Sequence, residues 1–489
     1  MVEDIVNGIN AVVWSDALIA LALLSGIFYS FKTRFVQVRH FKEMLRLLFG
    51  GKASKRGVSS FQAFAIAISG RVGTGNIAGV ATAIALGGPG AIFWMWVIAF
   101  LGSASAFIEA TLGQLYKENK GGEYRGGPAY YIEKGLKIKW FAVLFAIATI
   151  LSTALFLPGV QANSIAAGIK TAFDIDPMYT GATIIVFLAL IVFGGVKRIG
   201  KFSEIVVPFM AIAYVLVAVV IIAINFREIP GVLTLIVTSA FGANQAFGGI
   251  VGMAIMWGVK RGIYSNEAGQ GTAPHAAAAA EVSHPAKQGL VQAFSVYIDT
   301  LFVCTATAFM ILFTFQYNVI DPDGGFIYEH LPGVGYGPEY TQMAIESQFP
   351  GFGKIFVAIS LAFFAFTTIM AYYFIAETNV SYLDKDNKKP WMIWVLRALI
   401  LGATFYGAIK SAALAWTMGD IGVGIMAWLN FIAIFLLRKP ALALLKDYER
   451  QKKAGIEEPL YDPDTDDLGI KDVDIWRRIA ARFKNGEAE

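Results

Sequence analysis

The chain has 489 residues, of which 56% are hydrophobic and only 16% carry a charge. A soluble protein of this length carries roughly a quarter charged residues, so the composition excludes an ordinary soluble domain. The net charge of +4 says little by itself, because in a membrane protein the placement of charge matters more than its sum. The one cysteine, Cys304, cannot form a disulfide within the chain.

Uncharged blocks of about 20 residues recur along the chain and match helices that cross about 30 Å of hydrocarbon. Residues 206–224 and 355–375, for example, hold no charge. These blocks predict an all-α integral membrane protein with eleven transmembrane helices. The predicted spans are 11–31, 61–87, 90–116, 139–168, 178–195, 204–224, 233–258, 289–316, 355–382, 391–409 and 413–437.

The basic residues of the connecting loops orient these spans. The loop after the first span is strongly basic, which places it in the cytoplasm under the positive-inside rule. Alternation from there puts the basic connectors at 117–139, 197–201, 260–287 and 385–389 on the same side. We therefore expect a multi-pass protein of the cell membrane with its N-terminus outside and its C-terminus in the cytoplasm. Glu3 and Asp4 precede the first block, so a signal peptide is not expected.

Two spans contain glycine-rich interruptions, at 69–76 in the second span and at 241–249 in the seventh. Glycine weakens a helix by about 1 kcal/mol, and unwound backbone at membrane depth is tolerated where it lines a cavity. Close packing of helices through small residues is the alternative explanation for either interruption alone.

The two interrupted helices are the first and sixth of a ten-helix set and run in opposite directions. This arrangement is typical of two five-helix repeats in inverted topology, with discontinuous helices at the midplane. The predicted organisation is an extra N-terminal helix and basic loop (1–60), two repeats (61–225 and 226–440) and a charged cytoplasmic tail (441–489). Freed amides suit a carboxylate and freed carbonyls suit an ammonium group or a cation, so the pair of breaks favours an amino-acid substrate.

Residues 87–102, GGPGAIFWMWVIAFLG, resemble the signature of the alanine or glycine:cation symporter family. Residues 260–274, KRGIYSNEAGQGTAP, resemble a second motif of that family, and the likeness extends over about 11–440. The resemblance implies the inverted-repeat fold of the sodium-coupled leucine transporters.

The wider fold resemblance also implies where substrate binds. It places the substrate carboxylate on the amides of Thr74 and Gly75, beside Gly73, and the amine near the Arg71 carbonyl. Gln161 in the third core helix faces the substrate or packs against a neighbouring helix. The resemblance further assigns three residues of the interruption at 241–249 to the substrate; these are Phe241, Asn244 and Phe247.

For the cation, the resemblance implies a sodium site made of the Ser69 and Val72 carbonyls with the hydroxyls of Thr367 and Thr368. Bonding of these hydroxyls to their own helix is the alternative. A second sodium site of the leucine transporters needs a hydroxyl in the sixth core helix, where Gly242 stands, so we expect a single coupled cation.

Arg71 lies in the first break, where an unpaired charge would be costly, and we expect it to pair with an acid. The sequence does not choose among four candidate acids, which are Glu109, Glu204, Asp299 and Glu377.

The sequence thus predicts a secondary symporter that imports small neutral amino acids, alanine or glycine, with sodium by alternating access, and that is not an enzyme. Proton coupling or exchange on the same fold is one alternative, and an amino-acid sensor without transport is another. We expect no cofactor apart from the co-transported sodium, contacts with membrane lipid, and no nucleic-acid or obligate protein partner.

Overall fold

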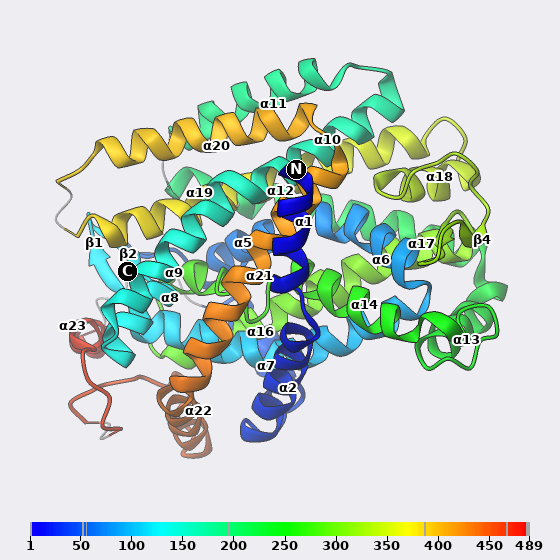
Figure 1. The fold of residues 1–489 in the computed structure, drawn as a ribbon. Helices are drawn as coiled ribbons and strands as arrows, with labels where there is room; N and C mark the ends of the chain where they lie inside the picture. The colour runs from blue at the N-terminus through cyan, green and yellow to red at the C-terminus, as the bar shows by residue number, and fades with distance from the viewer. Residues whose placement is uncertain are drawn as a thin grey trace.

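The computed structural model describes residues 2–50, 53–54, 56–193, 196–385, 388–465 and 468–485. The described chain is almost entirely helical, with two short antiparallel hairpins. The long helices run side by side across the molecule (Figure 1). The symbol η marks short segments of 3₁₀- or π-helix.

The chain begins with helices that precede the first break. Trp14 and Ser15 form a turn between the first two, and the Trp14 indole donates a hydrogen bond to the Asp420 carbonyl at 2.8 Å. The second helix packs on α7, near the centre of the molecule. These elements are α1 (Val2–Val13), α2 (Asp16–Lys32), α3 (Val36–Arg39) and α4 (Phe41–Leu48).

The next part of the chain begins with a capping box, in which Ser59 and Gln62 satisfy each other's amides and start α5. Its elements are α5 (Ser60–Arg71), η1 (Gly75–Gly79), α6 (Val80–Gly87), α7 (Gly90–Leu115), β1 (Glu118–Lys120), β2 (Glu123–Arg125), α8 (Pro128–Tyr131), η2 (Ile132–Leu136), α9 (Lys139–Leu151), η3 (Ser152–Phe156), α10 (Leu157–Phe173), α11 (Pro177–Val192) and α12 (Val196–Ile224).

The remaining elements complete the helical bundle and end in a polar tail. They are η4 (Phe226–Glu228), α13 (Ile229–Ala240), η5 (Gly248–Ile250), α14 (Val251–Asn266), α15 (Ala273–Ala279), α16 (Pro285–Val296), η6 (Tyr297–Cys304), α17 (Thr305–Phe313), β3 (Asn318–Ile320), β4 (Phe326–Glu329), α18 (Pro338–Gln348), α19 (Gly353–Leu383), α20 (Trp391–Ile409), α21 (Ala412–Leu436), α22 (Arg438–Lys453) and α23 (Asp474–Lys484).

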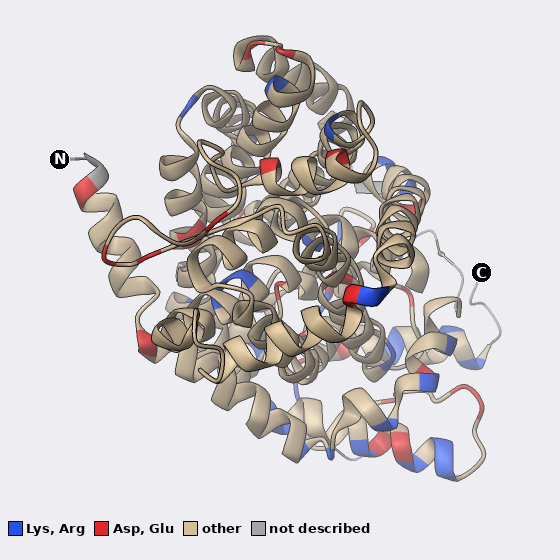
Figure 2. Cartoon of the chain, turned by 90° about the vertical axis from the view of Figure 1, so that its right-hand side faces the viewer, with Lys and Arg blue, Asp and Glu red and all other residues tan. Residues whose placement is uncertain are grey.

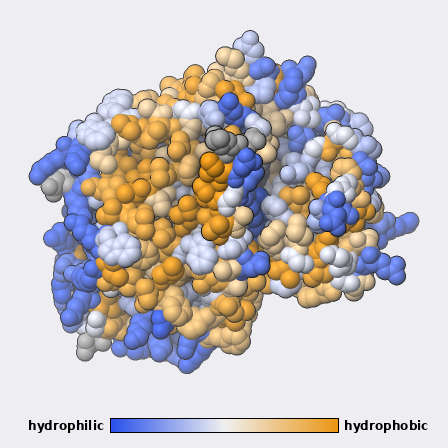
Figure 3. Space-filling model, viewed as in Figure 1, coloured by the Kyte–Doolittle hydropathy of each residue, from blue (hydrophilic) through white to orange (hydrophobic). Residues whose placement is uncertain are grey.

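Eight helical stretches of the described chain are long and apolar enough to cross a membrane, and Gly75–Gly87 and Pro177–Val192 are shorter apolar helices. Hydrophobic residues form a broad outer face, and hydrophilic residues gather toward its left and right edges (Figure 3). Long stretches of helix carry no charged residue (Figure 2). An apolar surface of this extent suits a lipid environment.

Most predicted spans match helices to within a few residues, and 391–409 coincides with α20. The seventh predicted span is interrupted where the sequence predicts, because α13 ends at Ala240 and α14 begins at Val251. It differs from the prediction at its end, since α14 continues to Asn266 and not only to residue 258.

The contact between α10 and α20 depends on two glycines. A methyl group at Gly407 would lie 2.2 Å from the Gly159 Cα atom, whereas one at Gly402 of the same helix would meet nothing within 4 Å. We expect Gly407→Ala to lower the free energy of unfolding by about 1–3 kcal/mol through overpacking. Gly402→Ala, the matched control, should unfold at the wild-type temperature or above it. Thermal unfolding in detergent measures both, and equal temperatures for the two variants would contradict a close α10–α20 contact at Gly407.

Candidate functional site

The helix formed by α5 and α6 is broken in the interior of the molecule. Regular α-helix stops at Arg71, and helical structure resumes at Thr74. The Gly73 amide donates to Asn76 Oδ1 at 2.9 Å, and the Thr74 amide donates to Gln161 Oε1 at 3.0 Å. Side chains therefore satisfy amides that the break removes from the helix, as buried backbone requires. The first predicted break is confirmed.

Carbonyl oxygens freed on the other side of the break face α19. Thr368 Oγ1 lies 2.8 Å from the Ser69 carbonyl oxygen and 3.5 Å from that of Val72. A methyl group at Gly73 would lie 2.3 Å from the same hydroxyl, so glycine permits this close approach. Both threonine hydroxyls also bond within their own helix, since Thr367 donates to the Phe364 carbonyl at 2.9 Å and Thr368 Oγ1 lies 3.0 Å from the same oxygen. Three of the four residues predicted to bind sodium thus bring oxygen atoms together.

A second break lies between α14 and α15, at residues 267–272. Gly269 and Gly271 both have positive φ angles, which suit glycine. Their amides donate to the two oxygens of Glu109, at 3.2 and 3.1 Å, and the Gly269 carbonyl accepts from Asn430 at 2.9 Å. One carboxylate of α7 therefore holds the unwound segment in place.

The two breaks lie against each other. A methyl group at Gly70 would be 3.2 Å from Glu267 Oε2, and one at Gly75 would be 3.1 Å from the Ser265 Cα atom. Glu267 is buried, accepts from the Thr272 hydroxyl at 2.8 Å through Oε2, and finds no hydrogen-bond partner for Oε1 among the described residues. The centre of the molecule therefore combines unwound backbone with an acceptor oxygen that remains available.

A third buried carboxylate, Asp299 in η6, adjoins the first break. It accepts hydrogen bonds from Asn76 Nδ2 at 2.6 Å, from Thr300 Oγ1 at 2.7 Å and from Ser265 Oγ at 3.0 Å. Ser265 of α14 thus places a hydroxyl beside this carboxylate. The expectation of a single coupled cation stays a prediction.

Arg71 is fully buried, and its predicted ion pair is not formed at hydrogen-bonding distance among the described residues. Its Nη1 donates to the Gln292 carbonyl at 3.2 Å and to Ser295 Oγ, while Nε and Nη2 have no hydrogen-bond partner there. Three acids lie close enough to interact with its charge electrostatically, namely Glu267, Glu109 and Asp299.

The other two candidate acids for Arg71 are engaged elsewhere. Glu204 accepts from Gln62 Nε2 at 3.0 Å, and Glu377 lies 3.4 Å from Arg125. Neither acid is among the charges that act on Arg71.

The three residues predicted from the interruption at 241–249 lie away from both breaks. Phe241 is 59% exposed and packs on Phe93 at a ring distance of 5.0 Å. Asn244 accepts from a nearby amide, and Phe247 is buried beside Gly88. Because Gly88 is thirteen residues beyond Gly75, it lies about 20 Å along the helix from the break. The structure does not bring these three residues to the centre.

A buried ionic cluster closes the space between α14 and α21. Both oxygens of Asp420 accept from Arg261, at 2.8 and 2.9 Å, and Lys260 Nζ lies 2.7 Å from Oδ2. The Arg261 guanidinium lies 4.6 Å from the Trp416 ring centroid, and that ring approaches the space beside Gly79 of η1. The cluster therefore lies beside the first broken helix, just beyond its break.

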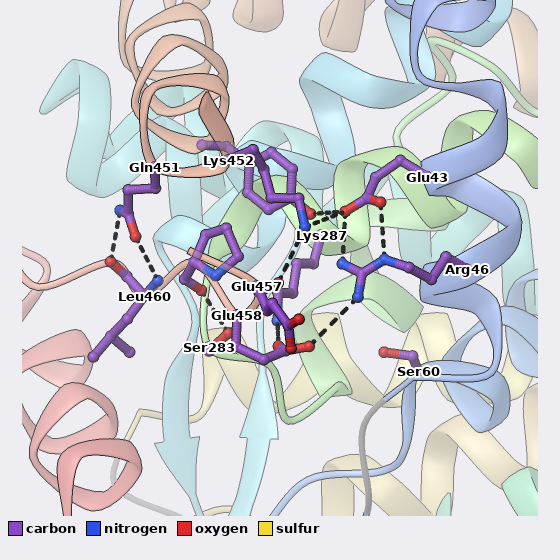
Figure 4. A network of polar contacts seen from close by, with 12 residues as sticks. Glu43, Arg46, Ser60, Ser283, Lys287, Gln451, Lys452, Glu457, Glu458 and Leu460 are labelled. Atoms are coloured by element: carbon purple, nitrogen blue, oxygen red, sulfur yellow. Dashed lines mark hydrogen bonds and ion pairs between the residues drawn. The ribbon is translucent and has the colours of Figure 1, made fainter. Parts of the chain in front are cut away.

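The C-terminal tail packs against the chain that follows α15. Gln451 of α22 exchanges two hydrogen bonds of 2.9 Å with the Leu460 backbone (Figure 4). Glu458 pairs with Lys287 of α16 and lies 3.7 Å from Arg46 of α4. The tail thus ties the chain after α15 to the N-terminal helices.

A profile of the sodium:alanine symporter family matches residues 1–462. The chain belongs to this family. Sodium:alanine symporter family members are transporters, so the chain is a multi-pass membrane transporter and not an enzyme.

Individual relatives of the sodium:alanine symporter family cover nearly the whole chain. YrbD of Bacillus subtilis is 63% identical over 475 residues, covering 97% of this chain and 98% of the relative. The sodium/proton-dependent alanine carrier protein of Bacillus sp. PS3 is 54% identical, covering 91% and 100%. The sodium/alanine symporter AgcS of Methanococcus maripaludis is 37% identical, covering 92% and 98%.

Two solved structures of transporters share the fold of this chain. One is a Na⁺-coupled sialic acid symporter, with a TM-score of 0.52 and 15% identity over 97% of this chain and 98% of the other. The second is a manganese transporter of Eremococcus coleocola, with a TM-score of 0.52 and 14% identity over 91% and 96%. At this identity the similarity concerns the fold alone.

Sequence reasoning missed Ser265, Glu267 and the anchoring role of Glu109. The signal was present, because residues 265–274 hold two glycines and a proline within the second family-like motif. The same segment is buried in the structure, although the sequence predicts a basic loop there.

Replacement of Glu109 tests how the second break is held. Glu109→Gln places an amide group where three N–H donors converge, so we expect residues 267–272 to open more readily, by about 1–3 kcal/mol. Hydrogen–deuterium exchange of this segment measures the change. The exposed Glu457→Gln variant, with the same chemical change, should exchange as the wild type does. Unchanged exchange in Glu109→Gln would show that the carboxylate does not hold the break.

Proposed function

We propose that the chain imports alanine, and with it glycine, by symport with sodium across the cell membrane. The observation that carries this proposal is the meeting of two unwound helical segments in the protein interior. There amides, carbonyls and buried carboxylates lie close together, which suits a zwitterion and a cation at one site. The names of the Bacillus sp. PS3 and Methanococcus maripaludis relatives support alanine and cation coupling.

We further propose eleven membrane-crossing segments with two inverted repeats at 61–225 and 226–440. The crossing segments are α2, α5–α6, α7, α9–α10, α11, α12, α14–α15, α16–α17, α19, α20 and α21. In this assignment the two broken helices are again the first and sixth of ten, although the second break is at 267–272. The basic loops support an external N-terminus and a cytoplasmic C-terminus. Segments 1–60 and 441–489 then flank the repeats.

The substrate would bind along the first break, at Arg71, Gly73, Thr74, Gly75 and Gln161. Its carboxylate would accept hydrogen bonds from the amides of Thr74 and Gly75, and the Thr74 amide already donates to the oxygen of Gln161. The second break replaces Phe241, Asn244 and Phe247 in this assignment.

The substrate ammonium group has a partner in the second break. The unpartnered Oε1 of Glu267 lies in the interior beside Gly70 and would accept from a substrate N–H group. A charged donor and a charged acceptor form a stronger hydrogen bond than neutral groups do.

Sodium would bind between the first break and α19, on the carbonyls of Ser69 and Val72 and the hydroxyls of Thr367 and Thr368. Unwound carbonyls coordinate the coupled ion in transporters with discontinuous helices. Thr367 would have to turn from its own helix carbonyl to contribute.

Proton coupling is a second candidate, and one observation favours it. Asp299 is buried beside the break, and its hydrogen bonds come from Asn76, Ser265 and Thr300, with no basic side chain within ion-pairing distance in the described chain. Ionisable groups inside membrane proteins commonly mark ion or proton pathways.

Uptake of labelled alanine into liposomes that hold the purified protein tests the proposal. An imposed inward sodium gradient should drive transient accumulation, because the cation moves with the substrate. Potassium in place of sodium should abolish it, and a proton gradient should not restore it. Uptake that does not depend on the sodium gradient would contradict sodium symport and would indicate a proton-coupled carrier or an exchanger.

Thr368→Val tests the sodium assignment. Loss of the hydroxyl should raise the sodium concentration for half-maximal uptake by about tenfold, equivalent to about 1.4 kcal/mol. Thr378 is the matched control on the same helix, because among the described residues its hydroxyl bonds only to Phe374 of that helix, at 2.9 Å. Thr378→Val should leave the sodium dependence unchanged. The same shift in both variants would mean that Thr368 has no special role.

A further inference from the structure

At the end of the molecule that carries the tail, α22, the end of α2 and the turn after α2 enclose a cavity of about 640 Å³, termed here the basic cavity. Of its twelve lining residues, eight are basic and one, Glu449, is acidic. Figure 1 shows α22 beside the lower end of α2. Such a concentration of one charge attracts anions.

Much of this positive charge is not neutralised within the protein. Arg39 pairs with Glu449 at 2.7 Å, and Arg450 pairs with Asp447. Lys439, Lys446 and Lys453 form no ion pair with any described residue. The cavity therefore keeps several charges that a bound anion would neutralise.

The helix α22 holds these lysines on one face. Lys439, Lys446 and Lys453 are spaced by seven residues, which is two helical turns, and all three are exposed. The opposite face is fixed to the protein by the buried side chains of Leu444 and Tyr448, and Tyr448 donates to Glu43. The lysines are thus presented by an anchored helix, not by a free tail.

The basic cavity lies where the apolar surface ends. Phe31 precedes the cavity residue Lys32 and is 68% exposed, and Leu436 precedes Arg438 by two residues and is 50% exposed. Exposed apolar side chains beside a basic cluster match the boundary between the hydrocarbon and the headgroup region.

We propose that the basic cavity binds the phosphate of an anionic phospholipid, with the acyl chains lying against Phe31 and Leu436. The ligand carries a phosphodiester without a compensating cation, as in phosphatidylglycerol. A zwitterionic headgroup is disfavoured because its ammonium group would enter a site rich in lysine and arginine. This inference is independent of which amino acid or ion is transported.

The test uses the full chain, purified and stripped of lipid, with native mass spectrometry to count bound phosphatidylglycerol. The test variant carries Lys439→Gln, Lys446→Gln and Lys453→Gln together. Each basic residue near an anionic surface contributes to the free energy of binding. The loss of three should therefore weaken the binding of phosphatidylglycerol by about a hundredfold. The matched control carries Lys388→Gln, Lys389→Gln and Lys471→Gln, which remove the same charge outside the cavity, and should bind as the wild type does.

Two further arms identify the ligand. Phosphatidylcholine should bind at least tenfold more weakly than phosphatidylglycerol, and millimolar inorganic phosphate should not displace the lipid. Equal retention of phosphatidylglycerol by the test and control variants would overturn the site. Displacement by inorganic phosphate alone would overturn the lipid assignment, because the cavity would then bind free phosphate. Thermal unfolding in detergent confirms that both variants are folded.

Discussion

Backbone that leaves a helix inside a membrane must find new hydrogen-bond partners, because lipid offers none. In this protein two unwound segments meet that requirement with side chains from other helices. Glu109 of α7 accepts from two amides of the second break, and Gln161 of α10 accepts from one amide of the first. The arrangement of α7, α10 and α19 around the breaks follows from this need. The glycines then allow the two segments to approach within contact distance.

Two groups of ion pairs around this central region differ in their chemistry. Arg261, Lys260 and Asp420 form a buried ionic cluster beside the first broken helix. The tail and α4 meet the chain after α15 through exposed and half-buried ion pairs. Buried pairs are costly to separate, whereas exposed pairs contribute about 0–1 kcal/mol each. The two groups therefore differ in how firmly their ion pairs hold.

Hydropathy located nearly all of the long helices, because a helix in lipid must be both apolar and about 20 residues long. It could not locate the second break. The interruption at 241–249 and the one at 267–272 are both rich in glycine, and local composition does not distinguish a connector from unwound backbone in the interior. Gln161 and Thr368 could be selected from the sequence. Glu267 and the surroundings of Arg71 could not, since those contacts join segments about 200 residues apart in the chain.

Gln161 occupies the Thr74 amide with its own oxygen, at a distance that a carboxylate would also adopt. A substrate that took this amide would exchange one hydrogen bond for another instead of gaining a new one. The net stabilisation from such an exchange is about 0.5–1.5 kcal/mol, far below the value of an isolated bond. Release then becomes correspondingly easy, because the glutamine restores the lost bond as the substrate leaves. For a substrate that binds at this amide, the side chain would thus act as a built-in competitor and would limit affinity in favour of turnover.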